Sequence, residues 1–488
     1  MASDNVRAQD ELRNEEERVS ARSAVFKKEL GLTDLALTQI LFIVGLPWVG
    51  TAGKLGPSHI IFWLLAIFLF YLPSAAVVIY LNRVMPLEGG LYQWAKLGFN
   101  ELMGFMVAWN LWLFVVLNTS EIGLQAATSL AYALGPKAAW VASSKWLISL
   151  ISTAIIGTLV VISTLGLGVG KWVHKAGAIM MLVIFGTLLL LPILNLARGQ
   201  ITEYRPLATA VPAVSLFSLN ILGKLGFGAL GGFEYVAIHA GECRDPVRSI
   251  ARSVILAAPV IALMFILGTS SVIALIKPDD IDLIGPIPQV LSVGFQSFGI
   301  VSYIVPLAIF AFLWIRIAQS SVMFTGNTRL PMVAGWDHLL PEWFTRLHPK
   351  YKTPVNSVLF VGAMTLAIGL VGLIGVGEQE AFQLLWNASG IFYALTYLVM
   401  FALPLIGLRK TGERMPLWLK AAAASGFLMT LLYVALSVFP IVKVESQLVF
   451  AIKIASVIIT ANIIGAALFV IAERRRKASR AKTAVTTL

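Results

Sequence analysis

Long apolar runs recur from one end of the chain to the other. An α-helix needs about 20 mostly apolar residues to cross ~30 Å of hydrocarbon, and the chain has twelve runs near that length. They lie near residues 34–54, 58–81, 102–127, 146–165, 172–196, 214–239, 250–276, 300–325, 355–374, 382–408, 417–439 and 448–472. With 58% hydrophobic and 13% charged residues, the chain has more apolar surface than a soluble core can hide. The sequence therefore predicts an all-α polytopic membrane protein of about 12 transmembrane helices.

The basic residues are distributed unevenly among the short loops. The net charge of +12 comes from scattered Lys and Arg rather than from one basic face, so we expect no nucleic-acid partner. Alternate loops carry most of these residues, for example Arg244, Arg248 and Arg252. The positive-inside rule then places both termini in the cytoplasm and requires an even number of spans. We expect an integral protein of a bacterial inner membrane, with cytoplasmic tails at 1–30 and 477–488.

Motifs for several other functions are missing from the sequence. Cys243 is the single cysteine, so it has no partner for an internal disulfide. No CxxC pair or HExxH helix offers a metal site, and no GxxxxGK[ST] loop offers a nucleotide site. No nucleophile–base pair lies in any span. We expect no metal, no cofactor and no enzyme activity.

Two spans contain residues that a membrane helix normally avoids. Residues 43–50 of the first span hold Pro47 between two glycines, and residues 226–234 of the sixth hold four glycines. Proline removes a backbone donor, and glycine costs about 1 kcal/mol relative to alanine in a helix. Irregular backbone at this depth is tolerated where it is buried in protein or lines a wet cavity. Glycines also let helices pack closely, but two breaks five spans apart favour an inverted repeat with a binding site between them.

Three stretches of the chain resemble motifs of one transporter superfamily. Residues 86–92 (PLEGGLY) are similar to its P-x-x-G-G-x-Y stretch, and 232–234 (GFE) with 242–246 (ECRDP) to its G-F-E followed by E-x-x-x-P. Residues 327–354 resemble its S-R-x-x-Y-A-M-A-R-D-G-x-L-P … K-x-T-P loop. On these motifs the chain resembles the amino acid/polyamine/organocation (APC) permeases over most of its length.

The resemblance implies a LeuT-type fold in a transporter domain spanning 31–476. It implies a 5+5 inverted repeat, with repeat one at 31–200, repeat two at 210–410 and peripheral helices 11 and 12 at 415–474. It also implies secondary active transport of amino acids by alternating access, as proton-coupled symport or exchange. A polyamine or organic amine transporter or antiporter is the alternative, and a ligand-binding receptor derived from a transporter is another. The expected partners are a small-molecule substrate and the lipid bilayer.

The candidate substrate-binding residues flank the two breaks. Relatives carry a G-S-G stretch whose backbone N–H groups receive the substrate carboxylate, but here proline and tryptophan stand in that place. Backbone amides of Val49, Gly50 and Thr51 are the remaining donors, and carbonyls near Gly45, Leu230 and Gly231 are expected to hold the amino group. The full set is Gly45, Pro47, Trp48, Val49, Gly50, Thr51, Phe227, Gly228, Leu230, Gly231 and Gly232.

Ionisable side chains inside the membrane are costly and therefore candidates for function. Glu234 follows the second break and is a candidate for coupling or gating, or for capping the half-helix. Arg316 in the eighth span is a second such candidate and needs a counter-ion, for which Glu234 is the nearest in depth. Lys224 is expected to extend outward along the sixth helix rather than meet an anionic substrate. A polar stripe on the third span is expected to join helices or to line the outer vestibule: Asn118, Glu121 and Gln125.

Overall fold

The computed structural model describes residues 28–45, 47–299, 301–372, 378–407, 415–441 and 446–486, together with 14, 17–19, 21, 22 and 24. Helices account for nearly all of this part, and its β-structure is limited to an isolated bridge between Leu30 and Cys243. Most of the expected tail at 1–30 lies outside the described residues. At the other end, helix continues through Thr486.

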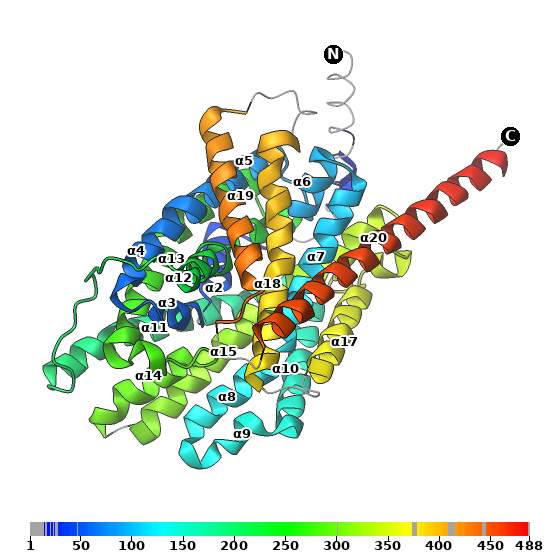
Figure 1. Cartoon of the computed structure of the whole chain (residues 1–488). Coiled ribbons are helices and arrows are strands. Elements are labelled where there is room, and N and C mark those ends of the chain that lie inside the picture. The colour runs from blue at the N-terminus through cyan, green and yellow to red at the C-terminus, as the bar shows by residue number, and fades with distance from the viewer. Residues whose placement is uncertain are drawn as a thin grey trace.

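Twelve helical segments correspond to the twelve apolar runs (Figure 1). Within the described residues ten are long and apolar enough to cross a membrane, one bent pair makes an eleventh, and the twelfth is a shorter apolar helix. In order they are α2 (Leu32–Ile43) with α3 (Pro47–Gly53); η1 (Gly56–Ser58), α4 (His59–Ala66), η2 (Ile67–Tyr71) and α5 (Leu72–Val84); α7 (Glu101–Ser120) with α8 (Ile122–Leu134); α10 (Lys145–Leu165); α11 (Leu167–Ala197); α12 (Leu216–Gly223), η4 (Lys224–Ala229) and η5 (Phe233–Glu242); α13 (Pro246–Leu275); α15 (Val301–Asn327) with α16 (Arg329–Trp336); α17 (Val355–Gly372); α18 (Glu378–Ala402); α19 (Leu417–Ser437); and α20 (Gln447–Thr486).

Shorter helices connect these segments on both faces of the bundle. They are α6 (Leu91–Gly98), η3 (Pro136–Ala138), α9 (Trp140–Ser143), η6 (Pro278–Asp280), α14 (Pro286–Phe295), η7 (Gln296–Phe298) and η8 (Glu342–Thr345), whereas η9 (Leu403–Gly407) directly continues α18. The last long helix, α20, packs on α7 and α18 and projects beyond the bundle in Figure 1. Only 17% of its most apolar window is buried, so α20 lies at the periphery.

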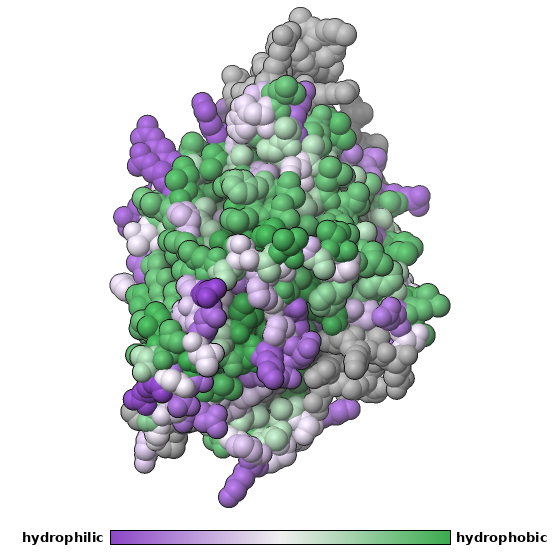
Figure 2. Space-filling view, turned by 60° about the vertical axis from the view of Figure 1, so that its left-hand side comes forward, coloured by the Kyte–Doolittle hydropathy of each residue, from purple (hydrophilic) through white to green (hydrophobic). Residues whose placement is uncertain are grey.

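The outer surface of the bundle is apolar around its middle. Figure 2 shows hydrophobic residues covering the centre of one face, with hydrophilic residues gathered mainly toward its two ends. Large apolar side chains point outward from the long helices, as Phe68 and Val183 do with 65% and 61% of their surface exposed. Water would penalise this exposure, whereas lipid tails accept it. The predicted all-α membrane fold is confirmed.

Both predicted helix breaks are present. The first span bends by 48° between the end of α2 and the start of α3. Pro47 is the first residue of α3, a position where its missing N–H has no intrahelical acceptor to lose. The sixth span passes from α12 into the π-helical turn η4 and then breaks before η5 at Gly232, whose φ is +137°. A Cβ at Gly232 would lie 2.6 Å from the Phe42 ring, so glycine also lets the two breaks touch.

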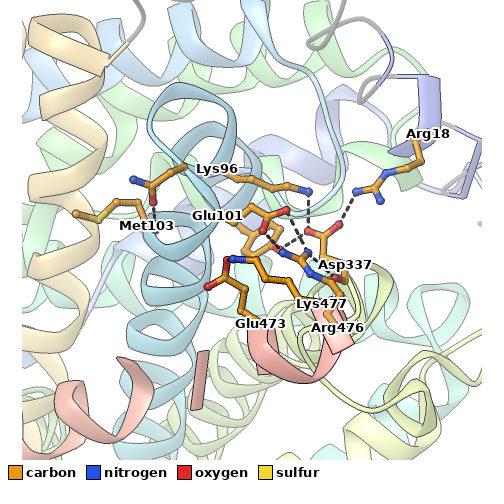
Figure 3. Close-up of polar contacts among 10 residues, drawn as sticks. Arg18, Lys96, Glu101, Met103, Asp337, Glu473, Arg476 and Lys477 are labelled. Atoms are coloured by element: carbon orange, nitrogen blue, oxygen red, sulfur yellow. Dashed lines mark hydrogen bonds and ion pairs between the residues drawn. The ribbon is translucent and has the colours of Figure 1, made fainter. Parts of the chain in front are cut away.

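Asp337, between α16 and η8, joins the two ends of the chain (Figure 3). Its carboxylate accepts hydrogen bonds from Arg18, from Tyr92 and, at 2.7 Å, from Lys96 Nζ. Arg476 Nη1 of α20 donates to the Asp337 carbonyl oxygen at 3.2 Å. Arg18 and Arg476, which lie near opposite ends of the described chain, thus meet at one residue.

Candidate functional site

The two breaks border one cavity of about 70 Å³. Its walls come from six of the long segments, so residues far apart in the sequence meet here. The lining comprises Phe42, Ile43, Gly45, Trp48, Phe114, Asn118, Phe227, Gly228, Gly231, Arg316, Gln319, Ser320, Met323, Trp386, Ser389, Gly390, Tyr393 and Tyr433.

Six of the candidate residues meet in this lining. They are Gly45, Trp48, Phe227, Gly228, Gly231 and Arg316. Pro47 and Thr51 line a second, smaller cavity of about 10 Å³, together with Trp48. The remaining candidates line neither cavity: Val49, Gly50, Leu230, Gly232 and Glu234.

Packing explains why part of the first break points away from the cavity. Gly50 faces α14, where an added Cβ would lie 2.8 Å from Pro286 Cβ. Val49 packs beside Gly268 of α13. The Gly45 carbonyl oxygen, expected to be open, accepts the N–H of Trp48 at 3.2 Å. Backbone groups of this break are therefore less available to a ligand than the sequence suggested.

Trp48 and Trp386 separate the larger cavity from the smaller one. Their ring centroids lie 5.4 Å apart with 51° between the planes, and both residues line both cavities. The Trp48 ring also lies over Gly228, where an added Cβ would come within 2.6 Å of it. The lack of a side chain at Gly228 therefore leaves room for the Trp48 indole at the second break.

Helix α18 supplies a wall that the sequence analysis missed. Trp386, Ser389 and Tyr393 line the cavity, and Tyr397 follows one turn later. Their spacing of i, i+3, i+7 and i+11 places them on one helical face. Tyr393 stacks on Phe114 of α7, with ring centroids 4.1 Å apart. In the sequence, the recurrence of polar and aromatic residues at this helical spacing was the signal that could have identified the wall.

Glu234 lies behind the cavity wall. Its carboxylate accepts hydrogen bonds from the hydroxyl groups of both Tyr393 and Tyr397. The Gly232 N–H in turn donates to Tyr397 Oη at 2.6 Å. Glu234 is 1% exposed, so Tyr393 stands between it and the cavity.

Arg316 is oriented by Gln319 rather than by Glu234. Its Nη1 donates to Gln319 Oε1 at 2.8 Å. Gln319 Nε2 donates to the carbonyl oxygens of Leu41 and Val44, both at 2.8 Å, where α2 ends. These carbonyls lack intrahelical donors because the helix stops there. The eighth span is thus bonded to the first break.

The expected pairing of Arg316 with Glu234 is wrong. The acidic side chain whose charge acts on Arg316 is Glu121 of the third span. Glu121 Oε1 accepts a hydrogen bond from Gln125 Nε2 at 2.7 Å, while Asn118 of the same stripe lines the cavity. Glu234 is directed to the α18 tyrosines instead, because it follows the break and the α-helical register ends there.

Lys224 does not extend outward as expected. Its side chain is 2% exposed, and its Nζ donates to Asn387 Oδ1 at 3.2 Å. Lys224 lies in η4, which packs against α19, so neighbouring helices enclose the side chain. It lines the smaller cavity, on the far side of Trp48 and Trp386.

Comparisons with known proteins agree with this architecture. A family model described as amino acid permease matches residues 30–471. An uncharacterized transporter of Legionella pneumophila is 24% identical over 77% of this chain and 80% of its own length. The branched-chain amino acid permease BcaP of Bacillus subtilis is 24% identical, with coverages of 74% and 79%. A probable agmatine/putrescine antiporter, AguD of Lactococcus lactis, is 20% identical, with coverages of 87% and 88%.

A solved structure shows the same fold. The crystal structure of MhsT in complex with L-phenylalanine superposes with a TM-score of 0.59, at 14% identity, over 84% of this chain and 98% of MhsT. MhsT has the LeuT-type fold. The LeuT-type fold implied by the motifs is therefore confirmed, while the exact bounds of the two repeats stay predictions.

Proposed function

The chain belongs to the amino acid permease family, and we propose that it carries amino acids across the membrane by alternating access. The observation that carries this proposal is that both helix breaks border one cavity. Discontinuous helices place free backbone groups and helix ends at mid-membrane, where transporters of this architecture bind their substrates. We further propose that the membrane is the bacterial inner membrane, with both termini in the cytoplasm.

The contacts around the cavity support alternating access. On one side Trp48 and Trp386 separate it from the smaller cavity. On the other side η5 is bonded to the loop after α5, through Glu88 and the Gly241 N–H at 2.7 Å, and to α16, through an ion pair between Glu242 and Arg329. Opening requires either the tryptophan pair or these contacts to separate. A transporter opens one side at a time, and here the closures on the two sides consist of different residues.

We propose Glu234 as the proton site of a proton-coupled symport, with substrate exchange as the other mode. Tyr393 connects this buried carboxylate to the cavity, since it both lines the cavity and donates to Glu234. Gain or loss of a proton on Glu234 would alter its bonds to Tyr393 and Tyr397. Because Tyr393 also lines the cavity, these changes would alter the α18 surface that faces the substrate.

Transport of amines or polyamines is the second candidate function, favoured by the likeness to the Lactococcus antiporter. A receptor that binds amino acids without moving them is a further alternative. Uptake of radiolabelled amino acids into proteoliposomes, with agmatine and putrescine as competitors, separates these functions. We expect accumulation of at least one amino acid that neither amine inhibits. Binding in detergent without accumulation would contradict transport, and uptake of amines alone would contradict the amino acid assignment.

A further inference from the structure

The cavity contains a fixed positive charge. Among the residues that the structure describes, Arg316 is the one charged side chain in the lining. It is 9% exposed, and a guanidinium does not lose its proton in proteins. A buried charge without close partners is strongly unfavourable. Arg316 therefore needs an anion, at least during part of the transport cycle.

The groups around Arg316 leave most of its donors unused. Nη1 donates to Gln319, while Nε is buried without a hydrogen-bond partner. Glu121 acts on the guanidinium through its charge, but the two side chains form no ion pair within 4 Å in the described structure. Glu121 is bonded to Gln125 and does not line the cavity. Arg316 thus lines the cavity with guanidinium N–H groups that are available to a ligand.

We propose that Arg316 binds the carboxylate of the transported molecule. The proposal rests on the function proposed above and names the chemistry of its site. A guanidinium and a carboxylate form two parallel, charge-assisted hydrogen bonds, a geometry that a backbone amide does not offer. Arg316 thereby replaces the amides of the first break, where α3 begins with Pro47 and where Val49 and Gly50 lie outside the lining.

The rest of the cavity suits the other end of an α-amino acid. The aromatic faces of Trp48, Phe227 and Tyr393 border it and can attract an ammonium group through cation–π contacts. The hydroxyl groups of Ser320 and Ser389 add acceptors to the lining. A zwitterionic amino acid thus fits with its carboxylate beside Arg316 and its amino group beside the aromatic rings and the serine hydroxyls.

This arrangement discriminates against polyamines. The lining contains no carboxylate among the described residues, and Glu234 lies behind Tyr393. A polyamine would bring two or more ammonium groups next to Arg316, with no anion inside the cavity to pair with them. Like charges at short range oppose binding. We infer that the substrates carry a carboxylate.

The first test compares acids with amides on the purified wild-type protein. Thermal unfolding is measured with each of the twenty protein amino acids, with the C-terminal amide of each, and with agmatine. A ligand that binds the folded state raises the unfolding temperature. We expect at least one amino acid to stabilise the protein, and its amide and agmatine to have no effect at the same concentration. Equal stabilisation by the acid and its amide would overturn the proposal.

The second test measures uptake kinetics of that amino acid for variants at 316. Arg316→Gln should raise KM roughly 10- to 100-fold, the range expected on losing a charged hydrogen bond. Arg316→Lys keeps the charge but not the planar fork, so its KM should fall between those of the wild type and the glutamine variant. Arg252→Gln, at an exposed position of α13, is the matched control and should leave KM unchanged.

Failure of this inference differs from failure of the proposed function. An unchanged KM in Arg316→Gln, with normal wild-type uptake, would overturn the role of Arg316 and leave the transport function intact. Absence of uptake of every amino acid by the wild type would overturn the function, while the acid and amide comparison in detergent would still report on recognition of a carboxylate. If Arg316→Gln does not insert into the membrane, the KM of Arg316→Lys decides the role of Arg316, and a KM equal to that of the wild type would overturn it.

Discussion

The indole ring of Trp48, from the first helix break, meets the indole ring of Trp386, from α18, with centroids 5.4 Å apart. The pair forms the wall between the two cavities, so it limits the length of a molecule that the larger cavity accepts. A substrate longer than the present cavity requires one of the two rings to move. The size range of the substrates therefore depends on this contact.

Trp48→Gly should broaden the range of amino acids transported. The change removes the ring between the cavities and joins their volumes. It should also destabilise the protein by about 3–5 kcal/mol, as for other large-to-small changes. Competition of uptake by amino acids of increasing side-chain size measures the effect, with Trp48→Phe as the conservative control. An identical size limit in Trp48→Gly and the wild type would show that Trp48 does not bound the substrate site.

Gly231→Leu should abolish transport while the protein remains inserted in the membrane. A Cβ at this position would lie 2.7 Å from the Phe227 carbonyl oxygen, and a longer side chain would enter the cavity. Gly157→Leu is a matched control, because Gly157 is exposed on α10 with open space around it. We expect uptake by Gly231→Leu at the level of empty vesicles and normal uptake by Gly157→Leu. Normal uptake by both variants would show that the substrate does not bind at the second break.

Glu234→Gln should separate coupling from exchange. If Glu234 carries the coupled proton, the variant loses accumulation driven by a pH gradient but keeps exchange at equal pH on both sides. The glutamine retains the size of the side chain, its amide oxygen can still accept a hydrogen bond from one of the two tyrosines, and its NH2 group can donate to the hydroxyl of the other. Equal loss of both activities would indicate a structural role instead. Undiminished pH-driven accumulation would exclude Glu234 as the obligatory proton site.

Glu88 predicts a pH dependence of stability. It lies between the second and third spans, where burial, together with the charge of Glu242, raises the pKa of Glu88 to about 8. The folded state then binds the proton more tightly than the unfolded state. The resulting stabilisation is complete below the unfolded-state pKa near 4.5 and is lost as the pH rises toward 8.

Unfolding temperatures between pH 5.5 and 7.5 test this dependence. The free energy of unfolding of the wild type should fall by up to about 1.4 kcal/mol per pH unit over this range, relative to Glu88→Gln. Glu342→Gln, at an exposed position, serves as the control and should follow the wild type. Parallel pH profiles for the wild type and Glu88→Gln would contradict the assigned protonation of Glu88.

Local sequence patterns predicted the helices and their breaks, because hydropathy, proline and glycine act within one segment. The direction in which side chains point was harder to predict. Gly45 lines the cavity, yet Gly50 faces Pro286, since the rotation of a half-helix depends on packing with distant segments. Glu121 precedes Arg316 by five spans, and no local pattern relates the two. The α18 wall shows a helical period, but identical periods arise in ordinary packing.

The central claim is that the amino acid is carried in the cavity between the two breaks, and reactivity of a cysteine at position 320 tests it most directly. Ser320 lines the cavity, while the native Cys243 is fully buried. In proteoliposomes, methyl methanethiosulfonate should inactivate Ser320→Cys and leave the wild type active. The transported amino acid should slow this inactivation, with half-maximal protection at its KM. Inactivation at the same rate with saturating amino acid, in a variant that still transports it, would contradict the account.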